Sequence, residues 1–123
     1  MTVLPLSEAP RHDLDGTRFT SLATPRRGTA ETSVWQVEIA PGTPATPHSL
    51  TREEVFVVLG GRAEVRLDTE RFDAGPGDAI VVPPGVELEL RNGDDEPLRL
   101  LCCLPVGGQA VVGTDAFTPP WAQ

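Results

Sequence analysis

The chain has 123 residues, which suits one domain, and its apolar fraction of 39% excludes a disordered protein. Its formal net charge of −8 argues against nucleic acids and anionic membranes as partners. All 10 basic residues are arginine, which excludes Schiff-base lysine chemistry and a P-loop. The 13 prolines and 12 glycines interrupt nearly every helix-length window, so long helices are not expected.

The first 28 residues are expected to form an N-terminal arm and an edge strand. The arm should end in a turn at Asp15-Gly16, and residues 17–22 have the length of a short strand. Met1 to Pro10 lacks the basic start and apolar stretch of a signal peptide, and no segment has the length of a membrane span. We therefore expect a cytoplasmic protein.

Hydrophobic periodicity and turn spacing predict an all-β core of short strands, a sandwich or a barrel, over residues 30–106. Residues 32–40 alternate between apolar and polar, as in a half-buried strand, whereas residues 54–59 are a nearly continuous apolar run. Residues 62–68 alternate again. The Gly60-Gly61 pair between the last two segments predicts a hairpin that joins them.

Three further strands are predicted in the second half of this core, over residues 79–82, 86–91 and 98–104. In the second of these, Leu88 and Leu90 alternate with charged residues. We expect the two leucines to be buried and the charged residues to be exposed, namely Glu87, Glu89 and Arg91.

Residues 107–123 are expected to form a C-terminal tail that begins with a short edge strand. The prolines around Thr118 argue against a helix, and the large apolar ring of Trp121 is expected to pack back on the barrel. The adjacent Cys102 and Cys103 should point to opposite faces of their strand. A disulfide between them would be strained, so we expect reduced thiols without catalytic activation.

A histidine and a carboxylate stand out in residues 42–61. We take this segment as extended, with a turn between Leu50 and Glu54 that preserves the alternation of side chains. Its even-numbered residues then face one side of a sheet: His48, Leu50, Glu54, Phe56 and Val58. The segment resembles the first motif of the cupins, G-x5-H-x-H-x3-E-x6-G. Four positions match, and the second histidine position holds Leu50; the matches are Gly42, His48, Glu54 and Gly61.

Residues 77–92 resemble the second cupin motif, G-x5-P-x-G-x2-H-x3-N. The histidine position holds Leu88, and the matching residues are Gly77, Pro83, Gly85 and Asn92. The resemblance implies a single cupin domain over residues 1–123, folded as a double-stranded β-helix or jelly-roll barrel. It also implies a homodimer. The apolar outer face of Val55, Val57 and Leu59 is compatible with a dimer or with coverage by a second sheet.

The cupin resemblance implies a metal held by three histidines and a glutamate, of which only His48 and Glu54 remain here. Since a transition metal needs three or four converging ligands, no metal is favoured. Substitute ligands from Cys102, Cys103, His12 or Gln36 lack the spacing of a recognised site.

We therefore expect a small-molecule-binding protein whose pocket is largely apolar. Its expected lining residues are Leu50, Phe56, Val58, Leu88 and Leu90. A His48–Glu54 pair facing this pocket could transfer protons in an isomerisation, cyclisation or elimination. The alternatives are a metal-dependent dioxygenase or isomerase that uses His48, Glu54 and unusual ligands, and a non-catalytic binding or sensor domain.

Overall fold

A computed structural model describes all residues, 1–123, and is almost entirely β-structure, as predicted. The only helical segments are the 3₁₀ turns η1 (Leu6–Glu8), η2 (Pro25–Arg27) and η3 (Pro120–Ala122). None of them has the length or hydropathy of a helix that spans a membrane. The strands are β1 (Arg11–Leu14), β2 (Thr17–Ala23), β3 (Thr32–Ile39), β4 (Ser49–Leu50), β5 (Glu54–Gly60), β6 (Ala63–Leu67), β7 (Glu70–Ala74), β8 (Ala79–Val82), β9 (Leu88–Asn92), β10 (Leu98–Pro105), β11 (Ala110–Val112) and β12 (Asp115–Phe117).

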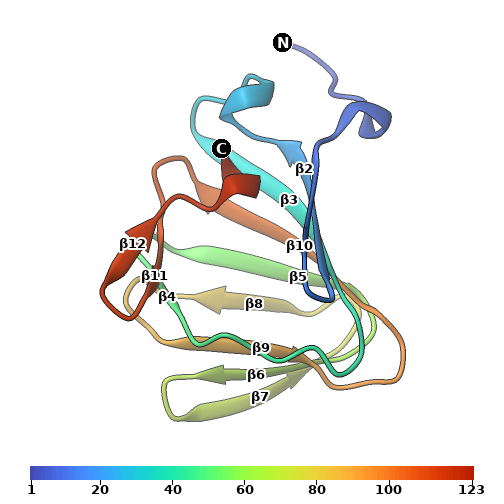
Figure 1. Cartoon of the computed structure of the whole chain (residues 1–123), viewed down its shortest axis with the longest axis vertical. Helices are drawn as coiled ribbons and strands as arrows, with labels where there is room; N and C mark the ends of the chain where they lie inside the picture. Colours follow the sequence, from blue (N-terminus) through green and yellow to red (C-terminus); the bar gives the residue numbers. More distant parts are fainter.

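The strands form a barrel from one six-stranded sheet and two three-stranded sheets (Figure 1). The large sheet has the order β1-β2-β3-β10-β5-β8, and the small sheets have the orders β12-β11-β4 and β7-β6-β9. All pairings are antiparallel. An isolated bridge between His48 and Leu88 joins the two small sheets into a second layer.

Alternation along the strands produces the core. Across the large sheet, strand register places Trp35 beside Cys102, Cys102 beside Phe56, and Phe56 beside Ile80. All four side chains are buried and belong to one hydrophobic cluster inside the barrel. The apolar residues of the expected alternating pattern are therefore the ones that fill the interior of the barrel.

The chain changes sheets at Gly60-Gly61. β5 pairs with β10 and β8, whereas β6 pairs with β7 and β9, so the predicted hairpin between residues 54–59 and 62–68 is wrong. Gly61 has a φ of +82°, and a Cβ there would lie 2.8 Å from the carbonyl oxygen of Pro97. These glycines thus form a corner between layers, because only glycine fits this backbone and this close approach.

Several elements near the ends of the chain differ from the expected ones. The turn at Asp15-Gly16 and the strand after it are confirmed, but the arm also contains the unexpected strand β1, which pairs with β2. The tail was expected to be non-helical, yet it contains the turn η3, because proline is tolerated in the first turn of a helix. The expected packing of Trp121 is confirmed: its ring stacks on Phe19.

The alternation predicted for residues 86–91 holds only in part. Leu88 is fully buried, but Leu90 is only partly buried and packs against the edge of the core. Glu89 was expected to be exposed, yet it is half-buried and accepts a 2.7 Å hydrogen bond from Arg66. The reason is that β6 places Arg66 directly opposite Glu89, which the sequence pattern of β9 alone does not reveal.

Leu88→Ala is expected to destabilise the protein by about 2–5 kcal/mol, because it leaves a cavity in the core. Leu90→Ala is the matched control and should cost clearly less, since Leu90 is already partly exposed. Urea denaturation of both variants measures the difference. A larger loss for Leu90→Ala would contradict the orientation of β9.

Candidate functional site

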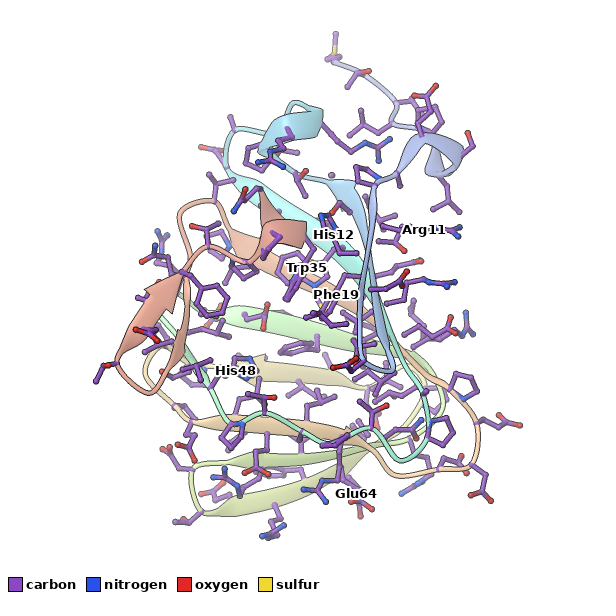
Figure 2. The ribbon with its side chains drawn as sticks, viewed as in Figure 1. Arg11, His12, Phe19, Trp35, His48 and Glu64 are labelled. Carbon is purple, nitrogen blue, oxygen red and sulfur yellow. The ribbon has the colours of Figure 1, made fainter.

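His48 faces the interior of the barrel. The His48 N–H donates to the Leu88 carbonyl at 3.1 Å, and the Leu88 N–H donates to the His48 carbonyl at 2.7 Å. Residues directly opposite in an antiparallel pair project to the same face, and Leu88 is completely buried. His48 itself is half-buried and precedes β4. Its position on the ribbon is labelled in Figure 2.

One ring nitrogen of His48 is already engaged. Nδ1 lies 2.9 Å from the carbonyl oxygen of Thr46. A carbonyl can only accept, so Nδ1–H is the donor in this contact. In the neutral ring, Nε2 is then the nitrogen that can accept a proton from another group.

Glu54 is the first residue of β5, and its side chain is only 3% exposed. It lies opposite Val82, which is fully buried. Burial raises the pKa of Glu54 to about 8, and no hydrogen bond or charged neighbour contributes to that shift. The barrel therefore contains a carboxylic acid that keeps its proton at neutral pH.

The predicted His48–Glu54 pair is not formed. No hydrogen bond or ion pair joins the two side chains: the Nδ1 of His48 contacts Thr46, and burial alone accounts for the state of Glu54. The physical reason is that β4 and β5 lie in different sheets, so the turn after Leu50 carries the chain from one layer to the other. The two groups thus lie on opposite layers instead of forming one unit.

The apolar residues expected to line the pocket lie in the core. Four of them are at most 7% exposed, and Leu90 packs against the same cluster; the four are Leu50, Phe56, Val58 and Leu88. None of the five lines either of two hollows on the molecule. The first hollow lies against charged side chains of β6, β7 and β9, which include Glu64, Arg66 and Arg71.

The second hollow, of about 280 Å³, lies where the tail packs against the ends of β3 and β10. Its wall includes the paired residues Ser33 and Leu104, both buried, and the tail residues Ala122 and Gln123. The register of β10 with β5 pairs Cys103 with Val55, so one residue further Leu104 lies beside Glu54. No local pattern in the sequence predicts this hollow, because its wall joins residues far apart in the chain.

Cys102 and Cys103 point to opposite faces, as expected, and both are free thiols. Burial raises the pKa of Cys102 well above its usual range, and Glu54 adds to this effect once it is ionised. Burial also raises the pKa of Cys103, again with a contribution from Glu54. Neither cysteine has the lowered pKa of an activated nucleophile.

The residues around His48 and Glu54 do not fit a transition metal. No three side chains of histidine, cysteine, aspartate or glutamate converge on one point. The two positions that hold histidine in the cupin motifs carry the buried leucines Leu50 and Leu88. Gln36 lies on the outer face beside Leu101, and His12 lies on β1, so neither completes a ligand set.

Comparison with known proteins gives one family and several relatives. Residues 35–104 match the family described as "Cupin domain". The uncharacterized protein MJ1618 of Methanocaldococcus jannaschii is 40% identical over 53 residues, which are 43% of this chain and 42% of that protein. The match thus spans only about two fifths of that curated relative's length.

Two solved structures show the same fold. KdgF from Halomonas sp. has a TM-score of 0.72 at 23% identity, with 85% of this chain and 94% of that chain covered. The polyketide cyclase RemF from Streptomyces resistomycificus has a TM-score of 0.76 at 20% identity, with 98% of this chain and 82% of that chain covered. These likenesses confirm the predicted double-stranded β-helix.

Proposed function

The chain belongs to the cupin family, and from that premise we propose that it binds a small, largely apolar molecule in its barrel without a metal ion. One observation carries this proposal: Glu54 is a buried carboxylic acid among apolar side chains. Ligand sites typically combine an apolar wall with a few polar groups that fix orientation. The hollow above Ser33 and Leu104 is the proposed entrance.

We further propose proton-transfer chemistry on a carbonyl compound. Glu54 would donate its proton to the carbonyl oxygen while Nε2 of His48 accepts a proton from the adjacent carbon, which gives the enol. Return of a proton to a different atom completes an isomerisation, and loss of a leaving group completes an elimination. RemF is named a polyketide cyclase, and cyclisation through an enol belongs to the same class.

The test is solvent deuterium exchange into 2-tetralone, an apolar enolisable ketone, followed by NMR. Wild-type protein should accelerate exchange next to the carbonyl, and Glu54→Gln or His48→Gln should lose that acceleration. Glu53→Gln is the matched control, because Glu53 is the exposed neighbour of Glu54. Binding of the ketone without exchange would instead indicate a non-catalytic binding domain. Equal exchange by Glu54→Gln would contradict the role of Glu54.

Protein purified without a histidine tag or added metal is expected to carry much less than one transition-metal ion per chain. The reason is that Leu50 and Leu88 replace two ligands and no third ligand converges on His48 and Glu54. Elemental analysis provides the measurement. A near-stoichiometric content of iron, manganese, nickel, zinc or copper that survives mild chelation would favour the metal-dependent alternative.

We also propose a homodimer that uses the outer face of the large sheet. Register aligns Val34, Cys103, Val55 and Val81 in one row across four strands, and Val81 is 52% exposed. No second sheet covers this face, because Leu59 is also exposed. Apolar surfaces of this kind mark interaction sites.

Val81→Asp is expected to convert this dimer into a monomer, because it places charge in the apolar face. Leu14→Asp is the control, since Leu14 is similarly exposed at 55% but lies on β1. Light scattering after size exclusion gives the mass of each variant. A wild-type monomer, or a dimer unaffected by Val81→Asp, would contradict the proposed face.

A further inference from the structure

The tail, residues 118–123, lies on the inner side of the large sheet and is held there as a bound peptide would be. The Oγ of Ser21 donates to the Trp121 carbonyl at 2.7 Å, and the Oγ of Ser33 donates to the Ala122 carbonyl at 3.0 Å. Both serines are buried, at 3% and 2% exposure. Without the tail, two hydroxyl donors on β2 and β3 would face a hollow.

Aromatic side chains complete this surface. The rings of Trp121 and Phe19 are stacked, with centroids 3.6 Å apart and planes 7° from parallel. Trp35 pairs with Ser21 across β2 and β3. Figure 2 shows Phe19, Trp35 and His12 gathered where the tail packs against these strands. The surface therefore already accommodates one flat ring above Phe19.

His12 adds a polar atom that has no partner. Register places His12 opposite Phe19, so the two side chains share a face. The Nδ1 atom of His12 is buried and forms no hydrogen bond. Buried polar atoms are normally satisfied, and an unsatisfied one costs stability. A ligand hydroxyl near Phe19 could supply the missing hydrogen bond.

We propose that the surface under the tail is a ligand site for a planar aromatic molecule that carries carbonyl oxygens, and that the tail occupies it in the absence of ligand. The aromatic ring takes the place of Trp121 on Phe19. The ligand's carbonyl oxygens accept the hydrogen bonds of Ser21 and Ser33, and a hydroxyl group can satisfy His12. This proposal deepens the proposed function, because it names the ligand class for the same end of the barrel.

The tail is suited to displacement. It is the end of the chain, and a ligand can replace each hydrogen bond that the serines make to it. The Phe19 and Trp121 rings lie nearly face to face, an arrangement that aromatic pairs favour less than an offset one. Arg26 makes two further hydrogen bonds to Gln123: its side chain donates to the Gln123 side chain at the surface, and its backbone N–H donates to the Gln123 carbonyl. Ala122 is buried at 5% exposure. None of these contacts belongs to the strand pairings of the barrel, so exchange requires the tail to leave but no strand to unpair.

The probe is anthraquinone-2-sulfonate, and anthracene-2-sulfonate is the matched compound without carbonyl groups. Calorimetry should show that Trp121→Ala binds the anthraquinone about tenfold more tightly than wild type, equivalent to about 1.4 kcal/mol. Ser21→Ala and Ser33→Ala each remove a hydrogen bond that the tail and the anthraquinone both use but the anthracene cannot. The affinity for the anthraquinone relative to the anthracene should therefore fall in both variants. Phe117→Ala is the control, because Phe117 is an exposed aromatic residue before the tail.

A spectroscopic test keeps the wild-type tail. In Trp35→Phe, Trp121 is the only tryptophan, so its emission reports whether the indole leaves Phe19 for water. The anthraquinone should shift that emission to longer wavelength. No shift, together with unchanged affinity in Trp121→Ala, would overturn the proposal. Deuterium exchange of 2-tetralone is measured on the same samples. Exchange without an emission shift contradicts the tail site alone, and an emission shift without exchange contradicts the proposed proton transfer alone.

Discussion

Glu54→Gln is expected to abolish a loss of stability that wild-type protein undergoes as the pH rises from about 4.5 to 8. The pKa of Glu54 is about 8 in the folded protein and 4.5 as its ordinary value. Over this range the unfolded chain releases a proton that the folded chain keeps, so rising pH favours unfolding. The unfolding free energy should fall by about 1.4 kcal/mol per pH unit, or about 5 kcal/mol in all.

Urea denaturation at pH 5, 7 and 9 measures this effect as the difference between wild type and Glu54→Gln. The two proteins should be similar at pH 5, and the variant should be the more stable at pH 9, since glutamine mimics the protonated acid. Glu53→Gln should keep the wild-type pH dependence, because Glu53 is exposed. Parallel pH profiles for wild type and Glu54→Gln would mean that Glu54 is ionised in the fold.

The second large effect is expected from Leu50→His combined with Leu88→His. Leu88 lies directly opposite His48, and Leu50 lies two residues further on the same face as His48. Without metal, each buried imidazole should cost about 1–3 kcal/mol if it has no partner. Zinc at a hundredfold excess over its dissociation constant should restore about 2.7 kcal/mol.

Thermal melts of this double variant, with and without zinc, test whether these positions converge. Leu98→His is the control, because Leu98 is fully buried on β10 but distant in register from His48. It should lose stability and recover none with zinc. A double variant that melts at the same temperature with and without zinc would show that the leucine positions do not surround a common point.

The sequence predicted the strands better than their partners. Alternation located β3, β6 and β9, because side chains on a strand project to alternate faces. Alternation could not show that the chain passes from one sheet to another at Gly60-Gly61. A pair of glycines is the local signal both for a hairpin turn and for such a corner. The close approach to Pro97 that explains the corner is a contact between distant segments.

The candidate site was predictable in the same limited way. Motif spacing identified His48 and Glu54, and both face inward, but the sequence suggested a pair where the structure has two separate groups. Glu54 keeps its proton because it is buried without a hydrogen-bond donor or a positive charge beside it. No local sequence pattern shows that such a partner is missing. The tail contact between Ser21 and Trp121 joins residues 100 positions apart, so no sequence window contains it.

We expect Glu54 to be a protonated acid inside the barrel at neutral pH. An NMR titration of the Glu54 side-chain carboxyl carbon, assigned by its loss in Glu54→Gln, tests it most directly. The expected midpoint is near pH 8, because burial opposes the charged form. A midpoint near the ordinary value of 4.5 would contradict the claim and would remove Glu54 as the proton donor of the site.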